Sequence, residues 1–324
     1  MTVQASTETL LQAARGGDET AFRELITPHV RALHLHSYRM LGSYHDAEEA
    51  LQETLLRAWQ GLPRYESRAP LRHWLYRITT TTCLKMINRR ARDPITQTLD
   101  VAWLQPYPDL LLDRLGDADA DPAAIVDRRE TVALAFIAAV QLLPGTQRAV
   151  LILREVLGWP AQQVADLLDT SVAAVNSALQ RARATLAQTR GTPALTSIDS
   201  ERERRVVAEF VRAWHDRDIP ALAALLRDDA ILTMPPQAIE IVGRDAVTEF
   251  FVTVPAGGRL DLIRLVEIRA NGHPAVAAYL PDEHSGECRG YGIMVLTLDG
   301  DQVAKITGFP DPSLFPAFAL STVR

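Results

Sequence analysis

The spacing of hydrophobic residues changes along the chain, and this change sets the order of its fold types. Up to residue 191, apolar side chains recur at helical spacing, as at Ala21, Leu25 and Leu33. After two further expected helices, strand-like runs follow at 230–234, 260–268, 275–280, 292–298 and 302–307. Asp299-Gly300, between the last two runs, is a strong hairpin signal. Helices followed by a largely antiparallel sheet predict two all-helical domains and then an α+β domain.

Proline and acidic residues mark the expected domain boundaries. Residues 94–122 carry four prolines and six aspartates, a composition typical of a linker. Two apolar patches, Trp103-Leu104 and Leu110-Leu111-Leu112, indicate that this linker docks on a folded domain. The sequence therefore predicts a first helical domain at 6–93, the linker at 94–122, a second helical domain at 123–190 and an α+β domain at 199–317.

The charge is segregated, and this bears on partners rather than on fold. The chain carries −6 overall, yet residues 1–94 carry +3 and residues 123–191 carry +2. The two basic blocks favour nucleic acid as a partner. Cys83 and Cys288 form no metal-spaced cluster, and neither a secretion signal nor a membrane-spanning run is recognisable. We expect a cytoplasmic protein without a metal, a cofactor or a membrane contact.

Residues 160–188 predict a helix, a tight turn and a second helix. In the second helix, Val172, Val175 and Leu179 fall on one face. The other face presents short and amide side chains first and arginines later, which is the order that a helix entering the major groove needs. A plain helical hairpin with a solvated polar face would give the same pattern. The candidate groups for duplex DNA are Ser171, Ala174, Asn176, Ser177, Gln180, Arg181 and Arg183.

Two longer motifs resemble one family. Leu143-Pro144, Gly158-Trp159-Pro160 and Val164-Ala165, together with the pattern above, resemble region 4 of bacterial extracytoplasmic-function (ECF) sigma factors. The segments 46–59 and 71–78 resemble region 2 of the same family. The resemblance covers roughly residues 8–188 and implies two helical sigma domains, a region 2 bundle and a region 4 helix–turn–helix. It assigns the residues of the second domain to the −35 promoter element.

The resemblance also implies roles for two segments of region 2. The acidic helix would dock on a basic coiled coil of the large RNA polymerase subunit, through Asp46, Glu49, Gln52, Glu53 and Leu56. A solvated acidic face is the plain alternative. The segment 65–92 would read the melted −10 element, since unstacked bases need aromatic or planar surfaces and a basic track. Its candidates are Arg68, Arg72, His73, Trp74, Tyr76, Arg77, Lys85, Asn88, Arg89 and Arg90, with a core position as the alternative for Trp74.

Some positions depart from the family pattern. Thr81 and Lys85 stand where the family commonly has Asn and Asp, Gln163 replaces an acidic residue, and Asn176 stands where Lys is frequent. The promoter sequence therefore cannot be transferred from relatives.

The C-terminal third resembles the SnoaL-like polyketide-cyclase family, a cone-shaped α+β barrel with a pocket. The resemblance rests on 206–218, 243–251 and 307–315, and the chain is identified as an ECF sigma factor with a fused SnoaL-like domain. The linker residues Trp103, Leu104 and Pro106 resemble a motif of such fusions. A pocket, or an ordinary core, would use Phe210, Trp214, Met234, Phe250, Phe251, Tyr279 and Tyr291.

Catalysis by this third domain needs at least two titratable groups that converge in a pocket. The candidates are His215, Asp216, His273, Asp282, Glu283 and His284, and the sequence alone cannot bring them together. We therefore assign no catalytic residue and expect the domain to regulate.

The resulting hypothesis is a sigma factor that binds core RNA polymerase and promoter DNA and is monomeric when free. A stand-alone helix–turn–helix regulator and a small-molecule enzyme are the alternatives, and binding of an anti-sigma factor or a small-molecule ligand is left open. A simple regulator has no need of an acidic docking helix or of a single-strand reader.

Overall fold

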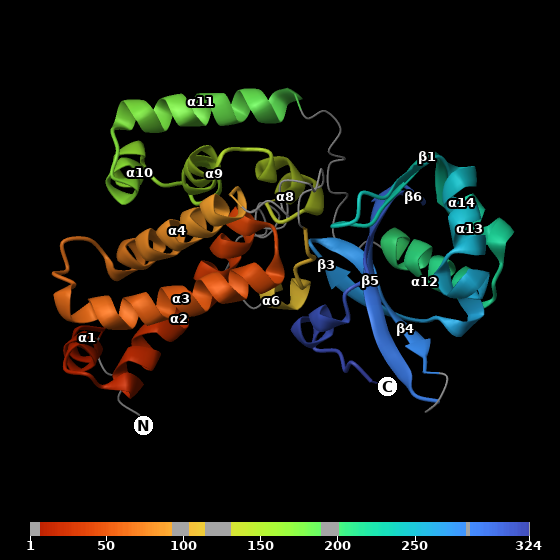
Figure 1. The fold of residues 1–324 in the computed structure, drawn as a ribbon, viewed down its shortest axis with the longest axis horizontal. Coiled ribbons are helices and arrows are strands. Elements are labelled where there is room, and N and C mark those ends of the chain that lie inside the picture. Colours follow the sequence, from red (N-terminus) through yellow and green to blue (C-terminus); the bar gives the residue numbers. More distant parts are fainter. Residues whose placement is uncertain (1–6, 93–103, 114–130, 189–200, 283–285, 324) are drawn as a thin grey trace. The chain divides into compact units, whose positions relative to one another are not determined.

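The structure is a computed structural model that describes residues 7–92, 104–113, 131–188, 201–282 and 286–323. The chain forms two compact units (Figure 1). The first unit comprises residues 1–98 and 137–190, and the second comprises 99–136 and 191–324.

The first unit begins with three long helices and their caps. Helices α1 (Thr7–Arg15), α2 (Glu19–Leu41) and α3 (Tyr44–Gly61) are followed by a 3-10 turn, η1 (Leu62–Arg64), and by α4 (Leu71–Arg90). Asp18 caps α2 by accepting from the backbone N–H groups of Thr20 and Ala21. Ser43 caps α3 in the same way through the N–H of Asp46.

Helix α4 contains the threonine run 79–82, which has poor helix propensity. The helix forms because three of these threonines are buried in the helix packing. The Thr79 hydroxyl donates to the Leu75 carbonyl oxygen at 2.9 Å. The Thr80 hydroxyl lies 2.9 Å from Nε2 of His36 on α2. Tertiary contacts therefore override local propensity here.

The second half of this unit is α8 (Leu134–Gln141, which begins at the edge of the second unit), α9 (Gly145–Leu151), a π-helical turn η2 (Ile152–Val156), α10 (Ala161–Leu168) and α11 (Val172–Gln188). The apolar spacing up to residue 191 predicts regular helices here, and the structure departs from this in two places. Between residues 131 and 143 the chain is helical only from 134 to 141. The helix that begins at Gly145 widens into the π turn from Ile152 onwards.

Arg148 on α9 joins the two halves of this unit. Its side chain is buried, and its Nη1 donates to the Met40 carbonyl oxygen at 2.6 Å and to Oε1 of Gln141 at 2.5 Å. Burial lowers the pKa of Arg148 to about 10, so the guanidinium still carries its charge near neutral pH. The C-terminal end of α2 is thus bonded directly to α9.

The second unit is an α+β fold around one curved sheet (Figure 1). Its helices are α6 (Asp109–Asp113), α12 (Glu201–His215), α13 (Ile219–Leu225) and α14 (Arg244–Thr253). The strands are β1 (Leu226–Thr233), β2 (Glu240–Val242), β3 (Arg264–Ala270), β4 (His273–Pro281), β5 (Cys288–Asp299) and β6 (Gln302–Phe309). Short 3-10 segments lie at Pro255–Gly258, Leu260–Leu262 and Pro312–Phe318.

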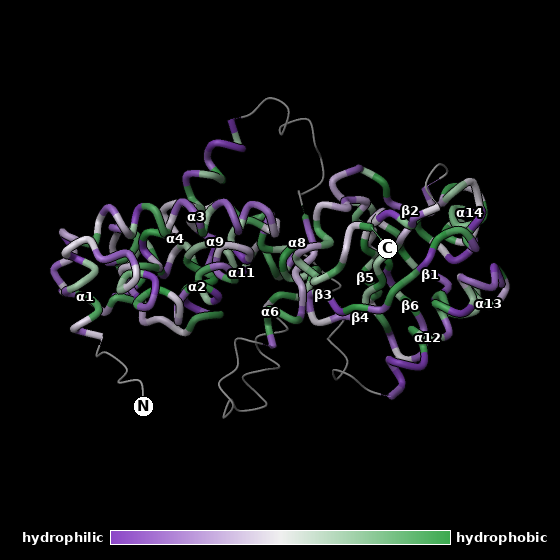
Figure 2. Tube along the Cα trace, turned by 90° about the horizontal axis from the view of Figure 1, so that it is seen from below, coloured by the Kyte–Doolittle hydropathy of each residue, from purple (hydrophilic) through white to green (hydrophobic). Residues whose placement is uncertain are grey.

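The strand order is β2-β1-β6-β5-β4-β3, with β1 and β6 parallel and the other pairs antiparallel. Helices α12, α13 and α14 pack with the sheet in one apolar core, and Figure 2 shows the hydrophobic strand β4 within it. The strand expected over 260–268 begins only at Arg264, because 260–262 forms a 3-10 turn. The short strand β2 was not expected from the sequence.

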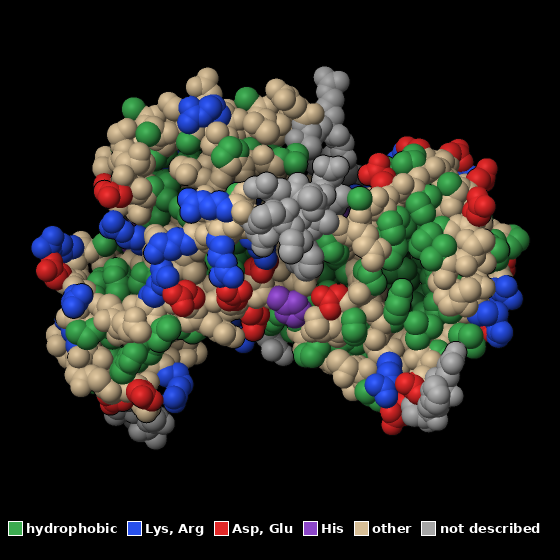
Figure 3. Space-filling view, in the orientation of Figure 1, with side chains coloured by type: hydrophobic (Ala, Val, Ile, Leu, Met, Phe, Trp, Pro, Cys, Tyr) green, Lys and Arg blue, Asp and Glu red, His purple; other side chains and the backbone are tan. Residues whose placement is uncertain are grey.

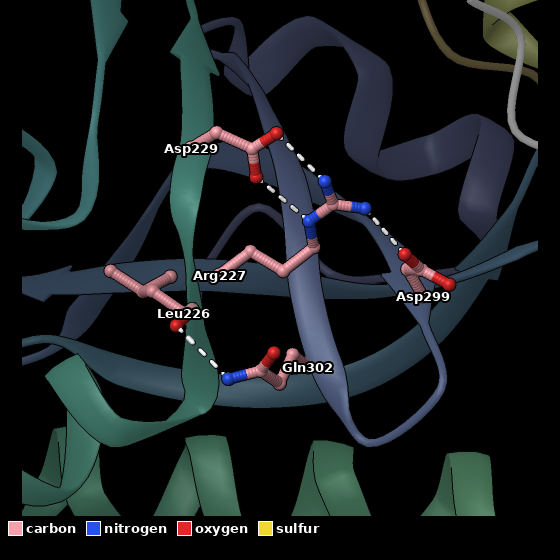
Figure 4. A network of polar contacts seen from close by, with 5 residues as sticks. All are labelled: Leu226, Arg227, Asp229, Asp299 and Gln302. Atoms are coloured by element: carbon pink, nitrogen blue, oxygen red, sulfur yellow. Dashed lines mark hydrogen bonds and ion pairs between the residues drawn. The ribbon is translucent and has the colours of Figure 1, made fainter.

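A polar network fastens the start of β1 to the hairpin of β5 and β6 (Figure 4). The guanidinium of Arg227 donates to both carboxylate oxygens of Asp229, at 2.7 and 2.8 Å, and also to Asp299. The Gln302 amide donates to the Leu226 carbonyl oxygen at 3.4 Å. Because Arg227 is exposed, this network contributes little to the free energy of unfolding, and it carries no functional assignment.

Candidate promoter and polymerase interfaces

Helix α11 has the exposure pattern of a recognition helix. Val175, Leu179 and Ala182 are buried against the rest of the unit. Ser171 begins the helix, and its hydroxyl accepts from the backbone N–H of Ala174 at 3.1 Å. All of the expected −35 residues are exposed in the structure, namely Ser171, Ala174, Asn176, Ser177, Gln180, Arg181 and Arg183.

Within this set, Arg183 and Arg181 differ in their partners. The guanidinium of Arg183 pairs with Glu155 of the π turn, with Nη2 and Oε1 2.5 Å apart. The described contacts hold no such ion pair for Arg181. For any anionic partner, Arg181 would therefore be available without first losing a carboxylate, whereas Arg183 would have to break or share its pair with Glu155.

The expected −10 residues divide between surface and core. On α4 and the loop before it, the cationic side chains of Arg68, Arg72, Arg77, Lys85 and Arg89 are exposed, as is Asn88. Arg90 is partly buried and pairs with Asp46. Tyr76 is 2% exposed. Its ring packs on His36 and Trp159, so in this arrangement Tyr76 is a core aromatic and cannot stack on a base.

Trp74 and His73 are half-buried, each against another ring. Trp74 packs on Tyr65 with ring centroids 4.9 Å apart. His73 lies over Trp159 with centroids 4.4 Å apart and 34° between the planes. Burial and the nearby Arg72 charge lower the pKa of His73, which keeps the imidazole neutral near pH 7.

A cleft of about 440 Å³ lies between this segment and α10. Cationic and aromatic side chains form much of its walls, namely Arg64, Tyr65, Arg68, His73, Trp74, Arg77 and Trp159, and the carboxylates of Glu66 and Asp166 also line it. Among the residues that sequence reasoning missed as part of this surface is Trp159. It is fixed there because its backbone N–H donates to the Leu153 carbonyl oxygen and its own carbonyl oxygen accepts from Arg154.

The acidic face of α3 keeps the expected side chains near the surface. Glu49 and Gln52 are exposed, and Leu56 is 51% exposed. Glu53 pairs with Arg57 at 2.6 Å, one helical turn away. Asp46 is bonded to Arg90 of α4, so Asp46 also holds the bundle together.

An apolar groove of about 370 Å³ lies beside this face, between α2 and α3. Phe22, Ile26, Val30, Leu55 and Trp59 line it. Phe22 and Trp59 meet edge to face with ring centroids 5.1 Å apart. The acidic row therefore borders exposed hydrophobic surface, which the sequence indicated only through Leu56.

The described part of the linker is bonded to the α+β domain. The Tyr107 backbone N–H donates to Oδ1 of Asn271 at 2.7 Å, and the Asn271 N–H donates to the Tyr107 carbonyl oxygen at 2.9 Å. The Asn271 side-chain amide also donates to the Val132 carbonyl oxygen at 2.6 Å. Asp109 is 2% exposed and accepts from the Gly272 N–H at 2.8 Å. We call the Asn271-Gly272 turn with these partners the linker clamp.

The expected linker motif falls partly within this contact. Pro106 is buried beside the clamp and Leu104 is partly buried, while Trp103 lies outside the described residues. Asn271 adopts a left-handed backbone with φ of 57°, which an asparagine tolerates better than most residues. This conformation lets its backbone and its side chain face the linker together.

The catalytic candidates of the α+β domain are dispersed. His215 Nε2 accepts from the Leu265 backbone N–H at 3.0 Å. His273 is half-buried, and the loss of solvation there lowers its pKa to about 4. Asp282 pairs with Arg289 at 2.8 Å, while Glu283 and His284 lie outside the described residues. The described lining of the domain's cavity includes none of these groups.

Of the expected pocket residues, Trp214, Met234, Phe250, Phe251 and Tyr291 line that cavity. Phe210 packs behind Trp214, and Tyr279 contacts Phe315 instead. Among the described residues, no group of three His, Cys, Asp or Glu side chains is placed to hold a metal ion. In the same part of the chain, each helix is too short or too polar to cross a membrane.

Comparison with known sequences gives the family. The ECF RNA polymerase sigma factor SigG of Mycobacterium tuberculosis is 40% identical over 325 residues, which cover 94% of this chain and 85% of the relative. SigM of the same species is 31% identical over 188 residues, 58% of this chain and 86% of the relative. This chain belongs to the ECF RNA polymerase sigma factor family.

Three domain-family models match segments of this sigma factor. Sigma-70 region 2 matches residues 25–93, Sigma-70 region 4 matches 133–186, and the SnoaL-like domain matches 207–306. The crystal structure of the M. tuberculosis ECF sigma factor SigJ shares the fold, with a TM-score of 0.62 and 22% identity over 90% of this chain and 97% of that one. The sigma factor, rather than the stand-alone regulator or the enzyme, is thus the correct reading.

As a member of this family, the protein binds core RNA polymerase and promoter DNA to initiate transcription. Its sigma homologues are initiation factors and not enzymes.

Proposed function

We propose that α11 reads the −35 element as duplex DNA while α4 and the preceding loop bind the melted −10 strand. The observation that carries this proposal is the exposure of all seven expected −35 residues, six on α11 and Ser171 directly before it, while the apolar face of the helix is buried. Asn176, Ser177 and Gln180 stand near the start of the helix, where short polar side chains reach base edges. Arg181 follows and meets a base or a phosphate.

For polymerase docking we propose the acidic face of α3 together with the groove between α2 and α3. Glu49 and Glu53 supply charge that steers a basic partner, Gln52 supplies a neutral amide for hydrogen bonding, and Leu56 supplies apolar contact area. The groove continues that apolar area at Phe22 and Trp59. In this proposal charge sets the orientation and the apolar groups supply most of the affinity.

The contacts between the two sigma regions describe a closed state of this unit. His73 and Trp74, proposed for the −10 strand, face a cleft whose other wall is Trp159 and α10. Promoter elements at −10 and −35 are separated by about 25 base pairs, or about 85 Å of duplex at 3.4 Å per pair. Two domains packed together cannot span that distance. We propose that they separate when the factor engages a promoter.

We propose that the SnoaL-like domain modulates this opening through the linker clamp. With the linker bonded at Tyr107, the 13 Cα–Cα steps from Arg92 to Gln105 can extend at most about 45 Å. When the linker is released, the 42 Cα–Cα steps from Arg92 to Leu134 can extend up to about 140 Å. The clamp therefore limits the distance by which regions 2 and 4 can separate. Release would allow longer promoter spacings.

The test is run-off transcription with core RNA polymerase of the host. The full chain would be compared with a chain truncated after Gly191, on promoters whose −10 to −35 spacing varies by single base pairs. We expect truncation to broaden the range of spacings that support initiation. An identical spacing profile for the two proteins would refute modulation by the SnoaL-like domain, and failure of both to bind core polymerase would refute the polymerase interface.

We infer that the protein acts in the cytoplasm, where RNA polymerase works, and that its SnoaL-like domain does not catalyse a reaction. The dispersed positions of His215, His273 and Asp282 support the second inference. His215 pairs with the backbone and Asp282 with Arg289, and the described lining of the cavity includes none of the three.

A further inference from the structure

The SnoaL-like domain encloses a cavity of about 80 Å³ between its helices and its sheet. Trp214 of α12, Phe251 of α14 and Met294 of β5 are among the groups that line it. Figure 3 shows hydrophobic side chains gathered around a hollow over this unit. The two polar side-chain groups among the described lining residues are the Trp214 indole and the Tyr291 phenol.

The indole N–H of Trp214 is buried without an acceptor. Trp214 is 2% exposed, and its Nε1 has no hydrogen-bond partner among the described residues. Phe251 meets the indole edge to face, with centroids 5.3 Å apart, and an aromatic face is only a weak acceptor. A buried donor that stays unpaired costs stability. Trp214 thus retains an unused donor at the wall of an apolar cavity.

The mouth of the cavity is also apolar. Val254 is 57% exposed and Tyr291 is 45% exposed, and both line the cavity. Met234 and Met294 form part of the wall. Their unbranched thioether side chains adapt to an inserted group more readily than branched ones. The cavity can therefore receive one ring or short branch, while the rest of a ligand lies over Val254 and Tyr291.

We propose that this cavity binds a neutral, mainly apolar small molecule that carries one carbonyl or ether oxygen, and that the Trp214 indole donates to that oxygen. A carboxylate or ammonium group is disfavoured, because the described lining offers no opposite charge to offset its desolvation. The described lining also holds no carboxyl, imidazole or amino group, so the molecule is bound and not turned over. The inference concerns the SnoaL-like domain alone and does not depend on the proposed promoter contacts.

The experiment uses a matched pair of probes, 1-indanone and indane, which differ by one ketone oxygen. The full chain is labelled with ¹⁵N in its tryptophan indoles, and the Trp214 resonance is assigned by its loss in Trp214→Phe. We expect 1-indanone to bind about five to ten times more tightly than indane and to move the Trp214 indole resonance. In Trp214→Phe, the two probes should bind with equal affinity.

A second variant tests where the probes bind and leaves the Trp214 indole unchanged. Ala278 lies on β4, is buried and lines the cavity, so Ala278→Leu fills space while keeping the wall apolar. We expect it to abolish binding of both probes. The proposal fails if both probes bind the unmodified chain equally or not at all at millimolar concentration. It also fails if the Trp214 resonance stays fixed at saturation or if Ala278→Leu binds 1-indanone normally.

Discussion

The imidazole of His73 lies over the indole of Trp159, with ring centroids 4.4 Å apart. His73 belongs to the segment that we assign to the melted −10 strand, and Trp159 precedes the helix–turn–helix of region 4. The Trp159 ring therefore occupies one face of the His73 imidazole. If His73 binds the −10 strand as we propose, region 4 would compete with single-stranded DNA for this face of region 2.

Replacing Trp159 by alanine should favour separation of the two regions. An aromatic pair of this geometry contributes about 0.5–1.5 kcal/mol, which corresponds to a two- to tenfold larger open population. Small-angle scattering of the free protein should show a larger radius of gyration. Binding of a single-stranded −10 oligonucleotide should tighten by a similar factor.

Loss of Trp159 also removes packing on Tyr76, so the far-ultraviolet circular dichroism of the variant must match that of the unmodified chain. Trp159→Phe is the matched variant, because it keeps a ring over His73. It should behave nearly as the unmodified protein does. If alanine at 159 leaves both scattering and oligonucleotide affinity unchanged, the closed contact does not limit access to His73.

Arg181→Ala should weaken transcription that depends on the −35 element. A contact to a base edge contributes about 1–3 kcal/mol, so initiation should fall roughly five- to a hundredfold in run-off assays at fixed salt. Binding to core polymerase should not change. Arg212→Ala, which removes an exposed arginine from α12 of the SnoaL-like domain, is the charge-matched control. Normal initiation by Arg181→Ala would place this arginine away from the DNA.

Leu56→Ala should lower affinity for core polymerase. Leu56 is a large apolar side chain left 51% exposed between Gln52 and Trp59 on the proposed docking face. Burying a leucine side chain contributes about 1.5–3 kcal/mol, so we expect its truncation to cost about 1 kcal/mol or more, a loss of at least about fivefold in affinity. Equilibrium binding to immobilised core enzyme would measure it. Equal affinity of Leu56→Ala and the unmodified chain would exclude this face.

Local patterns allowed the recognition helix to be predicted. The apolar positions of α11 repeat at helical spacing, so its buried face and its exposed face both follow from the sequence. The same reasoning placed Tyr76 among the base-stacking groups. Its burial against His36 and Trp159 depends on residues far away in the chain, which periodicity within one helix cannot reveal.

The linker clamp could be predicted only in part from the sequence. The apolar patches in an acidic, proline-rich segment indicated docking, and Tyr107 and Asp109 are indeed buried. The partner could not be found from the sequence, because Asn271 acts through a left-handed backbone in a two-residue turn between strands. In the sequence, an Asn-Gly pair between two strands indicates only a hairpin turn.

The buried His36 predicts how acid affects the helical unit. Burial, with a smaller effect of the Arg39 charge, lowers the pKa of His36 to about 3. The unfolded chain, with a His pKa of about 6.5, takes up the proton first, so the stability contributed by neutral His36 is complete above pH 6.5 and is lost as the pH falls towards 3. At pH 5 the loss is about 2 kcal/mol.

Urea unfolding of the helical unit at pH 7 and pH 5 would measure this loss. His36→Gln cannot titrate and still offers an amide to Thr80, so its free energy of unfolding should change less between the two pH values. Other histidines with a lowered pKa, such as His273, contribute equally to both proteins and cancel in the comparison. The same pH dependence in both proteins would show that His36 is not the group responsible.

Asn271→Gly should release the linker while preserving the turn. Glycine accepts a φ of 57° without strain, so the substitution removes the side-chain bonds to Tyr107 and Val132 and leaves the backbone conformation available. Asn271→Asp is the matched variant, because it keeps the acceptor for the Tyr107 N–H and loses only the donor to Val132. In run-off transcription on the spacing series, Asn271→Gly should approach the broad profile of the chain truncated after Gly191, and Asn271→Asp should fall between it and the unmodified protein. If truncation broadens the profile and Asn271→Gly does not, the SnoaL-like domain acts on regions 2 and 4 by a route other than the clamp.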